Sequence, residues 1–224
     1  MKENSFENEK KNFIFTKISK NLKQTKTIIF LGSKKTGKTS IISQFCKNKF
    51  NFIYNSTLGV NFYFQSCETN FGQITFNIWD TNGEEINEKI LPENIYFNAD
   101  AFVICCSYDN KESLNFIRNY FFFIRKFSNS KILIVVNKND VENKMFNKND
   151  VEKIANENNL NFIEINAKNN FNVDDVFLML TIGIFNDENY FNFDKIKKNI
   201  KIKNDKIEIN NNNNNNNNNK KHCC

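Results

Sequence analysis

The feature that most constrains this chain is the octapeptide Gly-Ser-Lys-Lys-Thr-Gly-Lys-Thr at residues 32–39, which follows an apolar segment at residues 27–31. It fits the pattern GxxxxGK[ST] between a strand and a helix, the context in which this pattern forms a phosphate-binding loop. The glycines let the backbone turn tightly, while N–H groups of the loop and of the following helix face the anion. The octapeptide therefore predicts a nucleoside triphosphate site, but it does not identify the base.

The side chains of this loop have separate expected roles. Lys38 places a positive charge between the β- and γ-phosphates, and the Thr39 hydroxyl is a ligand for Mg²⁺. The nucleotide-binding residues expected here are Gly32, Lys34, Lys35, Thr36, Gly37, Lys38, Thr39 and Ser40. The chain has only 6 glycines but is rich in asparagine, lysine and phenylalanine, whose codons can be A/T-only. A motif built from glycine is therefore more informative than one built from asparagine and lysine.

A second phosphate-sensing segment is expected at Asp80-Thr81-Asn82-Gly83, which ends another apolar run. Asp80 can hold the Mg²⁺ shell, and the Gly83 N–H can face the γ-phosphate. Upstream, the Thr57 hydroxyl can complete the Mg²⁺ coordination when the triphosphate is bound. Alone, the tetrapeptide is an ordinary turn sequence, and its position downstream of the phosphate loop is what favours a function.

The base-reading segment is expected at residues 137–140, Asn-Lys-Asn-Asp, directly after the apolar run at residues 132–136. The Asp140 carboxylate can accept from the two adjacent N–H donors of guanine, which adenine lacks. Asn137 can support the other edge of the base, and the Lys138 stem can pack on its ring. In a later loop, Asn166, Ala167 and Lys168 are also expected to bind the nucleotide, with the Ala167 N–H facing the guanine carbonyl.

The same tetrapeptide recurs at residues 147–150, where it precedes a helical pattern. There we interpret Asn149 or Asp150 as the N-cap of a helix. Only the first copy follows a strand, and open α/β sheets bind ligands at the carboxyl ends of their strands. The sequence therefore assigns the first copy to the site.

Short apolar runs alternate with helical patterns, which predicts an α/β fold with a mainly parallel sheet covered on both faces. The expected strands are residues 27–31, 61–69, 73–80, 101–107, 131–137 and 161–166. The second and third are separated only by residues 70–72, so they should form a hairpin with one antiparallel edge strand. Helical spacing recurs at Leu114, Ile117, Phe121 and Ile124, and again at Val173, Val176, Phe177 and Leu180.

Both ends of the chain differ from its centre, which predicts three parts. Residues 1–25 form a basic flexible arm, residues 26–185 the folded domain, and residues 186–224 a basic tail with an asparagine tract at 210–219 that should be disordered. The start lacks the pattern of a signal peptide, and no apolar run approaches the length of a membrane span. The six cysteines show neither metal-ligand spacing nor a disulfide framework. We therefore expect a reduced, cytosolic environment.

With these motifs in order, residues 26–185 resemble Ras-like small GTPases, and within them the Rab family. Residues 57–62, TLGVNF, resemble the Rab switch segment TIGxDF, and residues 79–85, WDTNGEE, resemble WDTAGQE. Other segments are similar to the Golgi-associated Rab subgroup. The resemblance implies a single P-loop G domain in which Phe50 stacks on guanine, and Phe62 and Trp79 form part of a partner-reading surface.

The resemblance also implies a biological setting. The expected ligands are GTP or GDP with Mg²⁺, and the expected partners are an exchange factor, a GTPase activator, a dissociation inhibitor and effectors, but no nucleic acid. Cys223 and Cys224 end the chain, as in Rabs that carry two geranylgeranyl groups. Two lipids give stable anchoring. A monomer regulating vesicle traffic is expected on the cytoplasmic face of an intracellular membrane, with the Golgi one candidate, in exchange with the cytosol.

Departures from the family pattern concern catalysis, for which the expected residues are Lys38, Thr57, Gly83 and Glu84. Glu84 stands where the family has the water-orienting Gln, and a carboxylate cannot donate that hydrogen bond. Lys34 can crowd an incoming arginine or neutralise γ-phosphate charge. We expect slow hydrolysis. A GTP-loaded scaffold with little turnover is the alternative, and an ATP-using P-loop enzyme is disfavoured by Asp140.

Overall fold

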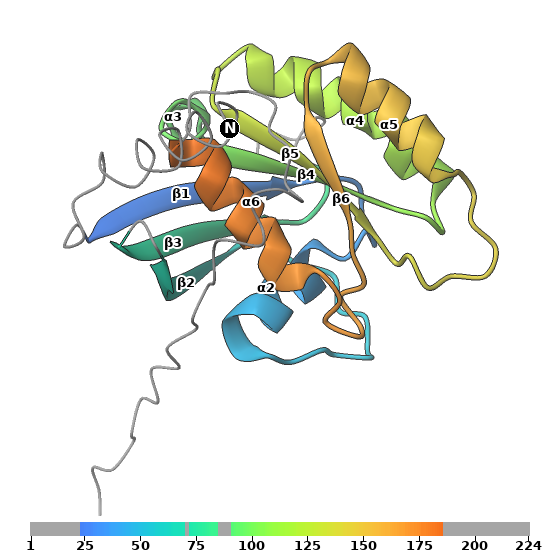
Figure 1. Ribbon diagram of the computed structural model, residues 1–224, viewed down its shortest axis with the longest axis horizontal. Coiled ribbons are helices and arrows are strands. Elements are labelled where there is room, and N and C mark those ends of the chain that lie inside the picture. Colours follow the sequence, from blue (N-terminus) through green and yellow to red (C-terminus); the bar gives the residue numbers. More distant parts are fainter. Residues whose placement is uncertain (1–22, 70–71, 85–90, 186–224) are drawn as a thin grey trace, which may run out of the picture.

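The computed structural model describes residues 23–69, 72–84 and 91–185, and a six-stranded sheet forms its central layer (Figure 1). The strands are β1 (Gln24–Leu31), β2 (Val60–Thr69), β3 (Gly72–Thr81), β4 (Ala101–Ser107), β5 (Lys131–Asn137) and β6 (Asn161–Glu164). Their order is β2-β3-β1-β4-β5-β6. The edge strand β2 runs antiparallel to β3, and the other neighbours are parallel. The predicted α/β fold with one antiparallel edge strand is confirmed.

Helices cover both faces of this sheet (Figure 1). The helices are α2 (Lys38–Lys47), α3 (Glu93–Phe97), α4 (Lys111–Arg125), α5 (Lys148–Glu157) and α6 (Val173–Phe185). Helices α2 and α6 bury their apolar residues in one core cluster, and α3, α4 and α5 in the other. Phe45 of α2 stacks on Phe177 of α6, with ring centroids 3.4 Å apart. The two helices on that face are thus packed directly against each other.

Alternation along the central strands divides the two cores. In β4, Val103 and Cys105 belong to the core under α2 and α6, whereas Phe102 and Ile104 belong to the opposite core. Every residue of β4 is buried. A strand covered on both faces by helices needs apolar residues at successive positions. This requirement explains the continuous apolar runs from which the central strands were predicted.

Some element boundaries differ from those predicted. Strand β1 begins at Gln24 rather than at residue 27, and β6 ends at Glu164 rather than at residue 166. Beyond β6, the backbone of Asn166 pairs with that of Phe171 in an isolated bridge, so the chain has already left the sheet.

The N-cap predicted for α5 at Asn149 or Asp150 was wrong, because the cap is Asn147. The Asn147 side chain accepts a hydrogen bond from the Asp150 N–H, and the Asp150 carboxylate accepts one from the Asn147 N–H. This reciprocal capping box starts the helix earlier than predicted. The second Asn-Lys-Asn-Asp copy therefore begins a helix, as predicted, but through its first residue.

The predictions for the two ends of the chain fall mostly outside the described residues. The arm up to residue 22, the asparagine tract and the Cys223-Cys224 pair all lie there. Within the described ranges, no helix combines the length and apolarity that crossing a bilayer requires.

Candidate functional site

A cavity of about 620 Å³ opens where the loops after β1, β5 and β6 meet at the carboxyl ends of the parallel strands. Its lining includes the predicted residues Lys35, Gly37, Lys38, Thr39, Ser40, Phe50, Thr57, Asn137, Lys138, Asp140, Asn166, Ala167 and Lys168. This volume suits a drug- or cofactor-sized ligand. Motifs far apart in the sequence are thereby brought to one place.

Six other predicted residues contact this wall or one another instead of lining the cavity. They are Gly32, Lys34, Thr36, Asp80, Gly83 and Glu84. Asp80 bonds to Thr39, and the Thr36 carbonyl accepts from Asn137. All of the predicted nucleotide-binding residues are therefore in or directly behind one site.

The phosphate loop holds a buried positive charge. Lys38 is 4% exposed, and its ammonium donates to the carbonyls of Gly32 and Ser33 at 2.6 and 3.2 Å. Gly37, just before α2, has φ of +94°, and a Cβ there would lie 2.2 Å from Asn137 Nδ2. Only glycine fits both the left-handed backbone and the close approach. The loop thus places an ammonium group and the N-terminus of α2 beside the cavity.

Three oxygen-bearing side chains converge at the start of α2. The Thr39 hydroxyl donates to Asp80 Oδ2 at 2.8 Å and lies 3.1 Å from the Thr57 hydroxyl. Asp80 is fully buried. Carboxylate and hydroxyl oxygens are the hard donors that Mg²⁺ prefers. The donor set therefore fits the predicted Mg²⁺ site, although its three members come from α2, β3 and the segment before β2.

Asn137 joins the phosphate loop to the base-reading loops. Its side chain is buried, and Nδ2 donates to the Thr36 carbonyl at 2.9 Å. Its Oδ1 accepts from the N–H groups of Ala167 and Lys138 at 3.1 and 2.8 Å. We expected Asn137 and the Ala167 N–H to face the base, whereas here they bond to each other. Asp140 is exposed in the cavity lining.

Asp109 was not recognised from the sequence, yet it positions Lys138. Lys138 Nζ lies 2.7 Å from one Asp109 carboxylate oxygen, and the Ser107 hydroxyl donates to the other at 2.8 Å. Burial acts to raise the pKa of Asp109, but the hydrogen bonds from Lys138 and Ser107 outweigh it and lower the pKa below its usual value. The ion pair fixes the end of the Lys138 side chain beside the cavity.

The segment after Phe50 was also missed. Phe52, Ile53 and Tyr54 line the cavity and are mostly exposed, and the Lys35 ammonium lies 5.7 Å from the centre of the Tyr54 ring. A cation near an aromatic face is attracted to it. The run of aromatics between α2 and Thr57 was the available signal. It was obscured because the chain contains 25 phenylalanines.

The two residues predicted for a partner surface lie together. Phe62 of β2 is paired with Trp79 of β3, and their rings meet edge to face with centroids 3.9 Å apart. Phe62 is 52% exposed. Their role in partner binding stays a prediction.

A mainly parallel sheet with a phosphate loop after its first strand and a cavity at the strand ends defines a P-loop nucleotide-binding protein. Comparison with protein families refines this class. Residues 27–186 match the sequence model of the Ras family, and the chain belongs to that family.

Relatives within the family include Ras-related protein SEC4 of Saccharomyces cerevisiae, 26% identical over 155 residues, 68% of this chain and 72% of SEC4. Ras-related protein Rab-12 of Mus musculus is 32% identical over 161 residues, 70% of this chain and 66% of Rab-12. Ras-related protein Rab-13 of Rattus norvegicus is 29% identical over 160 residues, 70% of this chain and 78% of Rab-13. The predicted resemblance to Ras-like proteins of the Rab kind is confirmed.

Proposed function

We propose that this protein is a Rab-like switch that binds GTP and GDP and slowly hydrolyses GTP to regulate membrane traffic. The observation that carries the proposal is the shared cavity at the strand ends. Its lining brings together Lys38, Thr39, Thr57 and the exposed Asp140 carboxylate, and Asp80 lies directly behind Thr39. Asp140 would select guanine through its two adjacent N–H donors, with Phe50 against the base.

In the reaction, a water oxygen bonds to the γ-phosphorus while the bond to the β–γ bridging oxygen breaks, giving GDP and phosphate. Thr39, Thr57 and Asp80 would hold Mg²⁺, which neutralises phosphate charge when bound. Lys38 would stabilise the charge that develops on the leaving oxygens, and the Gly83 N–H would donate to the γ-phosphate. Glu84 orients the water poorly because its carboxylate has no hydrogen to donate. Hydrolysis is therefore slow without an activator.

The switch itself is the ordering of the segments around Thr57 and Gly83 by GTP and their release after hydrolysis. Effectors would read this difference at the surface that contains Phe62 and Trp79. An exchange factor, an activator and a dissociation inhibitor would control the cycle. Prenyl groups on Cys223 and Cys224 would hold a monomer to the cytoplasmic face of an intracellular membrane such as the Golgi, in exchange with the cytosol.

A second candidate is a GTP-loaded scaffold with little turnover, and Glu84 is the residue that favours it. To separate the two, the purified full-length chain is loaded with radiolabelled GTP and Mg²⁺, and phosphate release is followed in a single turnover. A Glu84→Gln variant is measured in parallel.

Slow release by the wild type and faster release by Glu84→Gln would support the switch. Tight GTP binding without hydrolysis by either form would support the scaffold. Failure of both forms to bind guanine nucleotides would refute both functions.

A further inference from the structure

The phosphate loop and the loop after β3 are in direct contact. Gly83 approaches the phosphate loop so closely that a Cβ on it would lie 2.7 Å from the Lys34 backbone nitrogen. Next to this contact, Lys34 Nζ and Glu84 Oε1 form an ion pair at 2.7 Å. The pair therefore spans the two loops that are proposed to surround the γ-phosphate.

Glu84 is also held from within its own loop. The Glu84 N–H donates to Asn82 Oδ1 at 3.0 Å, and Asn82 Nδ2 lies 3.5 Å from Glu84 Oε2. Lys34 thus meets a carboxylate that its own loop already orients. Ser33, the residue before Lys34, accepts a hydrogen bond from the buried Lys38 ammonium through its carbonyl at 3.2 Å. The ion pair is therefore next in sequence to a residue that contacts this ammonium.

Stability is a weak explanation for this ion pair. The side chains of Lys34 and Glu84 are 48% and 36% exposed, and ion pairs at such positions contribute little to folding because water and salt screen them. Its location is more informative. GTP differs from GDP by the γ-phosphate, whose added negative charge would lie beside Gly83 and hence near Glu84.

We propose that Lys34 determines the preference for GTP over GDP by offsetting the negative charge of Glu84 beside the γ-phosphate. This inference rests on the proposed nucleotide binding. Without the lysine, the Glu84 carboxylate would repel the γ-phosphate and leave GDP almost unaffected. A lysine that only tied the two loops together would instead change the affinities for GTP and GDP by the same factor.

The test measures dissociation constants of the full-length chain for GDP and for a non-hydrolysable GTP analogue, both with Mg²⁺, at low and high salt. The variants are Lys34→Ser, Glu84→Gln and the double substitution. Arg118→Ser is a matched control, because Arg118 and Glu157 pair at 2.6 Å with similar exposure, 47% and 43%, on α4 and α5.

Lys34→Ser should lower the affinity for the GTP analogue relative to GDP by about tenfold, equal to about 1.4 kcal/mol. In the Glu84→Gln background the same substitution should change this ratio less than about twofold, because the repelling charge is gone. High salt should reduce the tenfold effect, and Arg118→Ser should leave the ratio unchanged.

An equal loss for both nucleotides, or the same loss of ratio with and without Glu84, would overturn the inference. Tight GDP binding in those cases would leave the proposed function intact. Absence of GDP binding by the wild type would refute the proposed function itself.

Discussion

The side-chain amide of Asn137 donates to the backbone carbonyl of Thr36 at 2.9 Å, across 101 residues of sequence. Its oxygen accepts from the Ala167 N–H, so one buried amide fixes the phosphate loop relative to the last loop of the site. The spacing between the loop proposed to bind the phosphates and the loop proposed to bind the base therefore depends on Asn137.

Replacing Asn137 by alanine should destabilise the domain and speed GDP release. The buried Thr36 carbonyl and Ala167 N–H would lose their partner, at about 1–3 kcal/mol for each buried polar group. We expect the free energy of unfolding, measured in urea, to fall by about 3 kcal/mol. Asn158→Ala is the control, since the Asn158 side chain donates to the Ile154 carbonyl at the end of α5, away from the site. Equal effects of the two substitutions on the rate of GDP release would contradict the linking role of Asn137.

The two Asn-Lys-Asn-Asp copies allow a test of base recognition. Asp140→Asn should weaken GDP binding by about 100-fold, because hydrogen bonds to a charged acceptor contribute about 1.5–3 kcal/mol each. Asp150→Asn keeps an acceptor oxygen for the Asn147 N–H but removes the negative charge from the first turn of α5, so it should lower stability by about 0.5 kcal/mol without changing GDP affinity. Affinities are measured by fluorescence titration. Loss of GDP binding in the Asp150 variant alone would reverse our assignment of the two copies.

Gly83→Ala should selectively weaken GTP binding. Gly83 has φ of +96°, and an added Cβ would meet the Lys34 nitrogen at 2.7 Å, so the loop after β3 must shift away from the phosphate loop. We expect the affinity for a GTP analogue to fall by at least about tenfold, equal to about 1.4 kcal/mol, with GDP affinity changed much less. Gly59→Ala separates strain from collision, because Gly59 has φ of +71° but a Cβ added there would meet no described atom within 4 Å. Similar losses in both variants would show that strain alone is responsible.

Asp109 should make stability depend on acid pH. Its folded-state pKa is lowered, so its contribution is present above the unfolded-state pKa of about 3.9 and is lost as pH falls through the folded-state value. Unfolding in urea should therefore separate the wild type from Asp109→Asn near neutral pH, and the two should converge in strong acid. A difference that stayed constant from neutral to strongly acid pH would show that the charge of Asp109 makes no contribution.

Local sequence patterns predicted the sheet well where one physical requirement dominated. Strands β4 and β5 have the predicted bounds, because burial on both faces demands unbroken apolar residues. The end of β6 was misplaced because the pairing of Asn166 with Phe171 diverts the chain, and no apolar pattern records that bridge. The N-cap of α5 was misplaced because asparagine and aspartate residues in the same short stretch offered competing caps.

The candidate site was predictable as a set of residues but not as a set of contacts. The motifs carry the residue types that phosphate, metal and base require. Their convergence follows from the parallel strand order, which brings the loops after the strands to one edge of the sheet. The Lys34–Glu84 and Asn137–Thr36 contacts join residues far apart in sequence, and no local spacing encodes them. Tyr54 was missed because, in a chain with 25 phenylalanines and 6 tyrosines, a single aromatic residue does not indicate a binding site.

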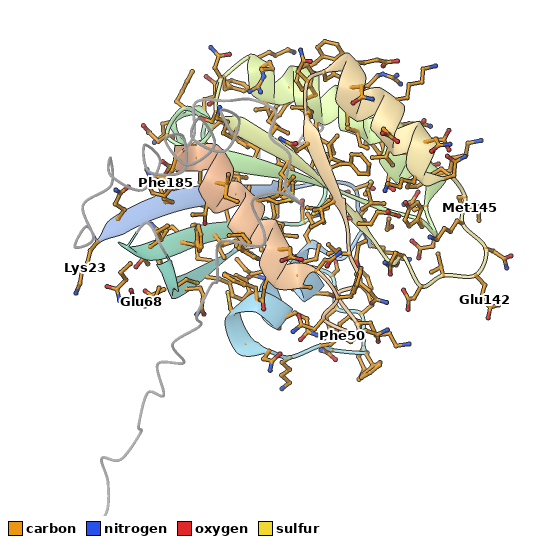
Figure 2. The ribbon with its side chains drawn as sticks, in the orientation of Figure 1. Lys23, Phe50, Glu68, Glu142, Met145 and Phe185 are labelled. Atoms are coloured by element: carbon orange, nitrogen blue, oxygen red, sulfur yellow. The ribbon has the colours of Figure 1, made fainter. Side chains whose placement is uncertain are left out.

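The stacking of Phe45 on Phe177 fixes the position of α6 relative to α2. It clamps α6 to the helix that begins at the phosphate loop, and α6 ends at Phe185, whose ring centre lies 5.4 Å from the Lys26 ammonium near the start of β1. From Lys26 to Gly32 the strand advances about 20 Å, and Phe50 and Phe185 lie on opposite sides of the domain (Figure 2). A surface that held the domain at Phe185 would therefore leave the cavity beside Phe50 accessible from the other side.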